Sequence, residues 1–324
     1  MAQHSVHVRE AAKYLSKLRL SWSDPDWPTN FLVVHKEDPT LVGLIREVVQ
    51  YLLEDTPAGQ TTIVWLPETL TEIHGDRIMH GCPETVDLVV TVGGDGTVLG
   101  AAWLFQEVVP PIVSFHSGTV GFLNTYSLVQ HPQVLQQIVT EGCRVNIRMR
   151  LSCEVRREKG PVTYHVLNEL VVDRGTSPMT TLDVFVDGTR MTTVQADGLI
   201  VATPTGSTAY SMAAGGSVIH PGVPAILITP ICPHTLSFRP LLLPDSVELV
   251  IRVNEGSRGN AWASFDGRAR MELNRGDEIA VSSSNFPVPT VCREDQTRDW
   301  FNGLARCLHW NDRPSANHLG VEPL

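Results

Sequence analysis

The first 142 residues alternate apolar, β-branched runs with stretches of helical periodicity, and few folds accommodate such an alternation. Continuous apolar strands separated by helices indicate a parallel sheet with helices on both faces. We therefore expect a Rossmann-like α/β domain over residues 30–142, preceded by an N-terminal segment over 1–29. The elements that carry this expectation are strands over 31–35, 61–66, 86–92 and 112–116 and helices over 40–54, 97–108 and 127–141.

Beyond residue 142 the pattern changes to short, mostly alternating runs, separated by turn-prone pairs such as Asp187-Gly188 and Asp266-Gly267. Period-two alternation between such turns is typical of antiparallel strands. We expect a β-rich, antiparallel, sandwich-like domain over 143–296. Apolar residues at helical spacing then predict a terminal helix over 297–312 that packs back on the first domain, followed by a tail over 313–324.

The charge balance limits the partners of this chain. Its 35 acidic and 25 basic residues give a formal net charge of −10, so no overall positive field attracts nucleic acid or an anionic membrane surface. No apolar run approaches the roughly 20 residues that cross a bilayer. We expect neither nucleic acid nor a membrane as a partner, and any anionic ligand must be held by local contacts.

The cysteines and the N-terminal residues bear on location. Six cysteines without a C-x-x-C pair argue against a zinc ribbon or a disulfide scaffold and favour reduced thiols inside a cell. The first 23 residues contain Arg9, Lys13, Lys17 and Arg19 against the single acidic residue Glu10. We expect an amphipathic helix there and a cytoplasmic protein, with a short mitochondrial presequence as the alternative.

A glycine-rich turn follows the apolar strand over 86–92, with the sequence Gly93-Gly94-Asp95-Gly96-Thr97. Glycines let the backbone turn sharply and approach a ligand closely. The dinucleotide fingerprint does not fit, because the third glycine falls one position late, and no P-loop motif occurs. A carboxylate fixed between glycines at the end of a strand can accept a proton from a substrate hydroxyl, so Asp95 is the candidate general base. The alternative is that Asp95 only caps the following helix.

Two further groups of polar residues are candidates for ligand contacts. The hydroxyl-rich turn over 203–210 precedes an expected helix over 209–214, and a helix N-terminus favours phosphate while hydroxyls orient a ribose. The alternative is a helix with an excess of N-cap residues. Asn168, Glu169 and Asp197 could hold ribose or base edges through hydrogen bonds, and the alternative is that they are surface turn residues.

Several motifs together resemble those of one protein family, although no single motif is specific to it. They are the turn over 93–97, the run over 116–123, Asn168-Glu169 followed by Asp173-Arg174-Gly175, Asp197-Gly198, and the turn over 203–210. Their order and spacing resemble those of the NAD kinase family, and the stretches over 229–240, 264–268 and 307–311 resemble its eukaryotic branch. The resemblance extends over roughly residues 18–312.

The resemblance implies transfer of the γ-phosphoryl group of ATP to the 2′-hydroxyl of the adenosine ribose of NAD, with Mg²⁺ as cofactor. It also implies an active site between a Rossmann-like domain and a β-rich domain, and a homodimer or homotetramer built largely through the β-rich half. NAD and ATP are then the small-molecule substrates. The sequence identifies no metal ligand and does not decide between NAD and NADH.

The site residues are assigned by position within the matching motifs. Asp95 corresponds to the proton acceptor of the family. Positions that match NAD contacts are Asp95, Gly96, Phe122, Asn168, Glu169, Asp197, Thr205, Thr208, Ala209, Tyr210 and Ala213. For the phosphates of ATP we expect contacts from Gly93, Gly94, Thr97 and Arg268, with Arg270 as a further cation.

Two features depart from the family pattern. Many bacterial members carry Arg or His where this chain has Gly100, so one phosphate contact is either lost or supplied elsewhere. The long regulatory N-terminal extension of many eukaryotic members is absent from this sequence, so we do not expect regulation by that route.

Two other functions share parts of these motifs. A lipid or sugar kinase would share the Gly-Gly-Asp-Gly turn, but the turn over 203–210 and the lack of a basic amphipathic segment that faces a membrane count against a lipid substrate. A non-catalytic NAD(H)-sensing protein would keep the pocket without turnover. The presence of Asp95 counts against a sensor, because a sensor needs no base.

Overall fold

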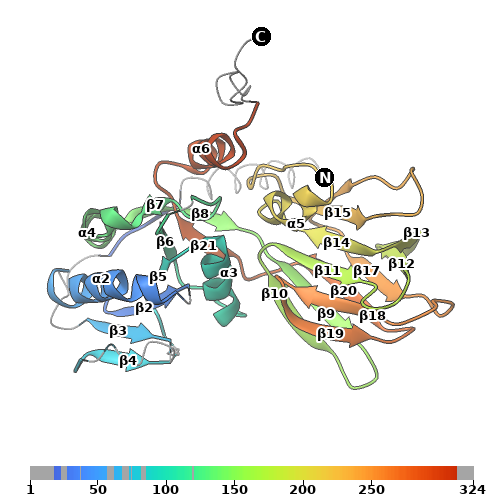
Figure 1. Ribbon diagram of the computed structural model, residues 1–324, viewed down its shortest axis with the longest axis horizontal. Coiled ribbons are helices and arrows are strands. Elements are labelled where there is room, and N and C mark those ends of the chain that lie inside the picture. The colour runs from blue at the N-terminus through green and yellow to red at the C-terminus, as the bar shows by residue number, and fades with distance from the viewer. Residues whose placement is uncertain are drawn as a thin grey trace, which may run out of the picture.

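The computed structural model describes residues 18–22, 28–36, 38–56, 62–67, 73, 75–81, 85–118 and 120–311. Most of the expected N-terminal segment, with its amphipathic helix, and the tail over 313–324 therefore lie outside the described residues. Within the described residues an α/β domain stands beside a β-rich domain (Figure 1), so the expected two-domain fold is confirmed. No helix in the described part of the chain is both long enough and apolar enough to cross a membrane.

The first domain is built on one mixed sheet with the strand order β1-β8-β21-β6-β5-β2-β3-β4, and β7 pairs with β6. Strands β2 to β6 run parallel, as the alternation of strands and helices predicts. The bounds are β1 Arg19–Leu20, β2 Asn30–His35, β3 Ile63–Leu66, β4 Ile78–His80, β5 Leu88–Val92, β6 Ile112–His116, β7 Tyr126–Ser127, β8 Cys143–Arg148 and β21 Val288–Val291.

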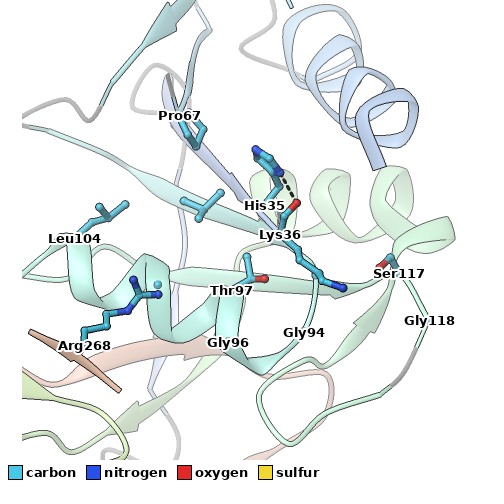
Figure 2. Close-up of a pocket in the computed structure, with 13 residues that line it drawn as sticks. His35, Lys36, Pro67, Gly94, Gly96, Thr97, Leu104, Ser117, Gly118 and Arg268 are labelled. Carbon is cyan, nitrogen blue, oxygen red and sulfur yellow. Dashed lines mark hydrogen bonds between the residues drawn. The ribbon is translucent and has the colours of Figure 1, made fainter. Parts of the chain in front are cut away.

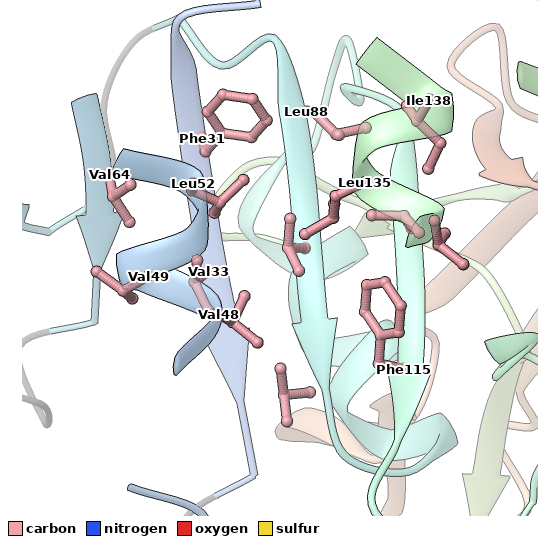
Figure 3. Close-up of a cluster of buried hydrophobic side chains, with 14 of the residues drawn as sticks. Phe31, Val33, Val48, Val49, Leu52, Val64, Leu88, Phe115, Leu135 and Ile138 are labelled. Carbon is pink, nitrogen blue, oxygen red and sulfur yellow. The ribbon is translucent and has the colours of Figure 1, made fainter. Parts of the chain in front are cut away.

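Helices cover both faces of this sheet. Neighbouring residues of β2 point to opposite faces, so Phe31 and Val33 join one apolar cluster and Leu32 joins another. Helices α2 (Val42–Glu54) and α4 (His131–Glu141) pack on the first of these clusters, as Figure 3 shows, and α3 (Asp95–Leu104) packs on the second. Each fully buried aliphatic or aromatic side chain contributes about 1.5–3 kcal/mol to such a core.

The boundary between the domains differs from the expected one at residue 142. Strands β8 and β21 belong to the first sheet, where β21 pairs in parallel with β6 and antiparallel with β8. The edge of β6 offers backbone N–H and C=O groups that need partners, and β21 supplies them. Short alternating strands therefore belong to both domains, and the β-rich domain itself extends from β9 to β20.

The β-rich domain contains two six-stranded sheets in which all the paired strands are antiparallel, with the orders β10-β9-β20-β17-β12-β13 and β16-β15-β14-β11-β18-β19. Side chains from both sheets form one apolar cluster that includes Leu182, Leu199 and Phe265, as expected for a sandwich. The bounds are β9 Leu151–Arg156, β10 Val162–Val166, β11 Glu169–Asp173, β12 Thr180–Val186, β13 Thr189–Ala196, β14 Gly198–Ala202, β15 Ala225–Ile231, β16 Leu241–Pro244, β17 Leu249–Val253, β18 Ala261–Phe265, β19 Arg268–Leu273 and β20 Glu278–Ser283.

The terminal helix expected over 297–312 is α6 (Gln296–Leu308). Its N-cap is Asp295, whose carboxylate accepts the N–H groups of the first turn. The helix contacts the segment that follows β6: the Cys307 thiol donates to Val120 O at 3.4 Å, and Gly303 lies against the Phe122 ring. Helix α6 thus packs back on the first domain and supports the loop that leads to the candidate site.

Candidate active site

The carboxyl ends of three neighbouring parallel strands meet at one edge of the first sheet. Lys36 follows β2, Gly93 follows β5 and Ser117 follows β6. Two backbone hydrogen bonds hold them together, from Lys36 N–H to Val92 O at 3.0 Å and from Gly93 N–H to Phe115 O at 2.9 Å. This edge is where open α/β sheets bind ligands. A cavity of about 870 Å³ opens here (Figure 2).

The cavity brings together the residues expected to contact ATP phosphates. Gly93, Gly94, Thr97 and Arg268 all line it, as does Gly96. Gly93 has a φ of 153°, and a β-carbon there would overlap the Thr97 hydroxyl, so only glycine fits this position. Since Arg268 belongs to β19 and the glycines to the first domain, the cavity lies between the two domains.

Sequence reasoning missed Lys36, which lines the same cavity. Its ammonium is largely exposed and lies 3.8 Å from the Asp38 carboxylate, a distance that leaves it available to a stronger anion. The sequence feature that could have identified Lys36 is its position directly after an apolar strand of the parallel sheet. Lys36 and Arg268 approach the Gly-rich turn from different elements in Figure 2, so an anion in the cavity can meet two cations.

Arg268 occupies the space that Gly100 leaves open on α3. Its Nη2 lies 3.0 Å from the point where a β-carbon of residue 100 would stand. Arg268 thus brings a cation from β19 to the side of α3 at Gly100. Arg270 does not share this role, because its guanidinium pairs with Asp173 at 3.1 Å and lies over the Trp262 ring.

Asp95 is the first residue of α3, and its carboxylate binds the loop that follows β6. Oδ2 accepts the N–H of Phe122 at 2.9 Å, and Oδ1 accepts the N–H of Leu123 at 3.0 Å and Nδ2 of Asn124 at 2.8 Å. The N-cap of α3 is Gly94, with no side-chain cap bond. The interpretation of Asp95 as only a helix cap is therefore wrong.

The hydrogen bonds leave one acceptor direction on the Asp95 carboxylate. Each carboxylate oxygen has two lone-pair sites, and Oδ1 uses both while Oδ2 uses one. A substrate hydroxyl can therefore donate to Oδ2 while the loop stays in place. Three fixed donors also hold the carboxylate in one orientation, which a proton acceptor in catalysis requires.

The turn over 203–210 contains the 3₁₀ turn Gly206–Thr208. The helix expected over 209–214 follows it as α5 (Tyr210–Ala213), which is one turn long and has Ala209 and Ala214 as its cap residues. The N–H of Gly216 bonds to Ser211 O, and Gly215 adopts a φ of 85°, which ends the helix. A single turn has no appreciable macrodipole, so the argument for phosphate at this helix N-terminus fails.

The same turn is instead joined to the start of β11. Thr203 N–H donates to Asn168 O at 2.9 Å, and the Thr203 hydroxyl donates to Leu167 O at 2.5 Å. A β-carbon on Gly206 would overlap Asn168 O, so the backbones touch. Asn168, Glu169, Thr205, Thr208, Ala209, Tyr210 and Ala213 therefore lie in one connected region. In this region the Thr208 hydroxyl donates to Thr205 O, and Tyr210 is the most exposed large side chain.

The buried Glu169 and the half-buried Asp266 are neighbouring acidic residues in this region. Asp266 accepts the backbone N–H groups of Leu167, Asn168 and Glu169 at 2.7–3.0 Å. Burial raises the pKa of Glu169 to about 8, and the charge of Asp266 adds to this rise. Burial also raises the pKa of Asp266, while the three N–H donors lower it.

Arg148, at the end of β8, is a second residue that sequence reasoning missed. Its Nε donates to the Thr290 hydroxyl at 3.0 Å and its Nη1 donates to the Thr205 hydroxyl at 3.3 Å. Burial lowers the pKa of Arg148, and the charge of Asp95 is one of those that oppose this shift. Arg148 thus connects the turn over 203–210 to the surroundings of Asp95. No local sequence signal marks it, because its partners come from distant segments.

Asp197 lies apart from the other expected NAD contacts. It precedes β14, whereas the turn over 203–210 follows that strand, which places the two roughly 20 Å apart along the strand. Its carboxylate pairs with Arg174, with Nε 2.9 Å from Oδ1. The structure therefore does not bring Asp197 to the site within one chain.

Comparisons with known proteins agree with this architecture. Residues 31–143 match the model of the ATP-NAD kinase N-terminal domain, and residues 167–292 match that of the ATP-NAD kinase C-terminal domain. The crystal structure of yeast NADH kinase complexed with NADH superposes with a TM-score of 0.83 at 32% identity, covering 90% of each chain. An NAD kinase from Archaeoglobus fulgidus in complex with ATP gives a TM-score of 0.64 at 25% identity, covering 85% of this chain and 98% of that one.

Curated sequences extend the comparison. An NAD(+) kinase of Saccharomyces cerevisiae is 46% identical over 323 residues, covering 88% of this chain and 60% of that protein. The chain spans about half the length of the curated relatives it matches. Both domain models, in the expected order, and a close structural match over 90% of the chain agree with the motifs and the site geometry. The chain belongs to the NAD kinase family.

Proposed function

We propose that this chain transfers the γ-phosphoryl group of ATP to the 2′-hydroxyl of the adenosine ribose of NAD, with Asp95 as the proton acceptor. One observation carries the proposal: the glycines that flank Asp95 line a cavity with two cations, and Arg148, which interacts electrostatically with Asp95, donates to Thr205 in the turn over 203–210. The cavity suits a polyphosphate donor, and the region of Asn168 and Glu169 suits a dinucleotide. The domain models of the family support both assignments.

The reaction needs alignment and charge neutralisation more than covalent help from the protein. Lys36 and Arg268 would hold the phosphates of ATP, and the backbone of Gly93, Gly94 and Gly96 allows them close approach. The 2′-hydroxyl gives its proton to Oδ2 of Asp95 as its oxygen bonds to the γ-phosphorus. The bond from that phosphorus to the bridging oxygen breaks, and ADP leaves with the electron pair.

Mg²⁺ is proposed to enter as part of the substrate Mg-ATP. Among the described residues, no group of three or more His, Cys, Asp and Glu side chains is placed to hold a metal ion. The neighbouring cations of Lys36 and Arg268 also fit a phosphate group better than a metal cage. NADH is a second proposed acceptor, because one structural relative is a yeast NADH kinase bound to NADH. A lipid or sugar kinase and a pure sensor have no comparable support.

The decisive test compares the wild-type protein with Asp95→Asn in an assay for NADP(H) formation from Mg-ATP and either NAD or NADH. Loss of the proton acceptor lowers kcat by about 10²- to 10⁴-fold, while NAD binding remains measurable by calorimetry. The kinase assignment is wrong if Asp95→Asn binds NAD and forms NADP(H) at the wild-type rate. Turnover of the wild type with neither acceptor, despite tight NAD binding, would favour a sensor.

Self-association as a homodimer or homotetramer is also proposed. Strand β16 ends one sheet of the β-rich domain, and its Leu241 and Leu242 are exposed, as is the nearby Leu236. An apolar sheet edge is suited to a second copy of the chain. Sedimentation equilibrium should give two or four chains per particle, and Leu242→Asp should shift the particle towards one chain. Retention of the assembly in that variant would exclude this edge as the interface.

The proposed location is the cytoplasm, with the mitochondrion as the alternative. The five described cysteines are all free thiols, which suits a reducing compartment. Imaging of the full chain with a C-terminal fluorescent tag distinguishes the two compartments.

A further inference from the structure

We propose that Glu169 takes part in dinucleotide binding as a neutral carboxylic acid, which donates a hydrogen bond to an acceptor oxygen of a ribose hydroxyl or a phosphate. The inference rests on the proposed function, since it concerns the same NAD-binding region. It assigns to Glu169 a protonation state opposite to the one that a glutamate normally has at neutral pH.

The first observation is the isolation of the Glu169 side chain. The residue is 8% exposed, and its Oε2 is buried without a hydrogen-bond partner among the described residues. None of the ion pairs in the described part of the chain includes it. An ionised carboxylate that is buried without a cation loses its hydration. The one backbone hydrogen bond that Glu169 accepts, from Tyr210, offsets only part of this cost, which the neutral acid largely avoids.

The second observation is the neighbouring carboxyl group of Asp266, on the turn between β18 and β19. Three backbone N–H groups point at the Asp266 carboxylate and stabilise its ionised form. Two adjacent carboxyl groups in one buried site do not both ionise readily, so a single proton is shared unequally. Burial raises the pKa of both carboxyl groups, but three N–H donors and Arg150 favour the ionised form of Asp266, whereas Glu169 has a single N–H donor, so we place the proton on Glu169.

The other elements around Glu169 do not reverse this assignment. Strand β14 places the apolar Ala202 opposite it. Helix α5 contributes a hydrogen bond from the Tyr210 backbone, which lowers the pKa of Glu169 but does not outweigh burial and Asp266. Arg150 acts on Asp266, where it favours the ionised form and so reinforces the assignment. The net result is a pKa of about 8 for Glu169.

The neutral acid suits the ligand in two ways. NAD carries a negatively charged pyrophosphate, so an ionised Glu169 would repel it, and the neutral form removes this repulsion. The neutral form also supplies an O–H donor in a region where the threonine and serine hydroxyls already donate to backbone carbonyls. Binding should therefore weaken as the pH rises through the pKa of Glu169.

The test measures the Kd of NAD by calorimetry, without ATP, at pH 7 and pH 9.5. If only the neutral form binds, the Kd of the wild type rises about 30-fold between these values. NAD itself does not titrate in this range. Glu169→Gln keeps a neutral donor at both pH values, so its Kd ratio should be close to one, and at pH 9.5 it should bind NAD more tightly than the wild type. Glu272→Gln, which removes an exposed carboxylate from β19, is the matched control and should keep the wild-type ratio.

The number of protons that the wild type takes up on binding NAD tests the same inference without a variant. At pH 9.5, calorimetry in buffers of different ionisation enthalpy should show that the wild type takes up nearly one proton for each NAD bound. A pH-independent Kd of the wild type, or a Gln variant that binds more weakly than the wild type at both pH values, overturns the inference. NADP formation by the wild type distinguishes failure of this inference from failure of the proposed function. If the wild type forms NADP but its Kd does not depend on pH, only the inference about Glu169 is wrong. If the wild type neither binds NAD nor forms NADP, the proposed function is wrong as well.

Discussion

Gly121 lies so close to Asp95 that a β-carbon at position 121 would overlap its Oδ1. Gly121→Ala should therefore push the loop over 121–124 away and break the hydrogen bonds from the Phe122 and Leu123 N–H groups. We expect kcat for NADP formation to fall at least about tenfold, because the general base loses its fixed orientation. Steady-state kinetics at saturating substrates measure this effect.

A control for that experiment is Gly43→Ala on α2, where a β-carbon meets no atom within 4 Å. This variant should keep the wild-type kcat. An unchanged kcat in Gly121→Ala would show that the contact between the loop and Asp95 is dispensable.

Arg268→Ala should raise the KM for ATP more than the KM for NAD. The guanidinium lines the cavity assigned to ATP, and a hydrogen bond to a charged group contributes about 1.5–3 kcal/mol, which corresponds to at least about a tenfold change. Arg270→Ala removes the same side chain two residues along the same strand, where it pairs with Asp173. The KM for ATP should not change in that control. Equal effects of the two variants would contradict a specific role for Arg268.

Gly206→Ala should weaken NAD binding. Its β-carbon would overlap Asn168 O, and because that atom belongs to the backbone, no rotamer change relieves the contact. We expect the Kd of NAD to rise about tenfold or more, with a loss of about 1–3 kcal/mol in the free energy of unfolding. Calorimetry and urea unfolding measure the two quantities. Gly43→Ala, where a β-carbon meets no atom within 4 Å, should change neither, and wild-type NAD affinity in Gly206→Ala would refute the close contact.

Arg148→Met tests whether a buried cation holds the turn over 203–210, to which we assign NAD binding. Burial lowers the pKa of Arg148, so the fold disfavours its charge, and removal of that charge offsets part of the loss of the hydrogen bonds to Thr205 and Thr290. We expect a change of no more than about 2 kcal/mol in the free energy of unfolding together with weaker NAD binding. Arg148→Lys keeps the charge but not the planar guanidinium with its several N–H donors. Its NAD affinity should lie between those of the wild type and Arg148→Met. A variant with reduced stability and normal NAD affinity would make Arg148 purely structural.

The elements of the first domain could be predicted because their signals are local. Strand β6 begins and ends at the expected residues, and the turn over 93–97 follows β5 as expected, since apolar runs and glycines act over a few residues. The helix expected over 209–214 is present as α5, but its length is set by contacts that are not local. Small residues allow a helix there, but the tertiary contacts of Ser211 and the turn at Gly215 limit it to one turn.

The sequence alone determined the two-domain organisation, the placement of Asp95 between a strand and a helix, and the family. Periodicity and short motifs depend on residues close together in the chain, and the order of the motifs can be read directly from the sequence. Only the tertiary structure decided that β8 and β21 complete the first sheet and that Arg268 fills the space beside Gly100. It also decided that Lys36 lines the cavity beside the Gly-rich turn, that Arg148 donates to Thr205 in the turn over 203–210, and that Asp197 pairs with Arg174 away from that turn. These relationships join residues far apart in the chain. They arise from strand pairing and side-chain burial, which no local pattern encodes.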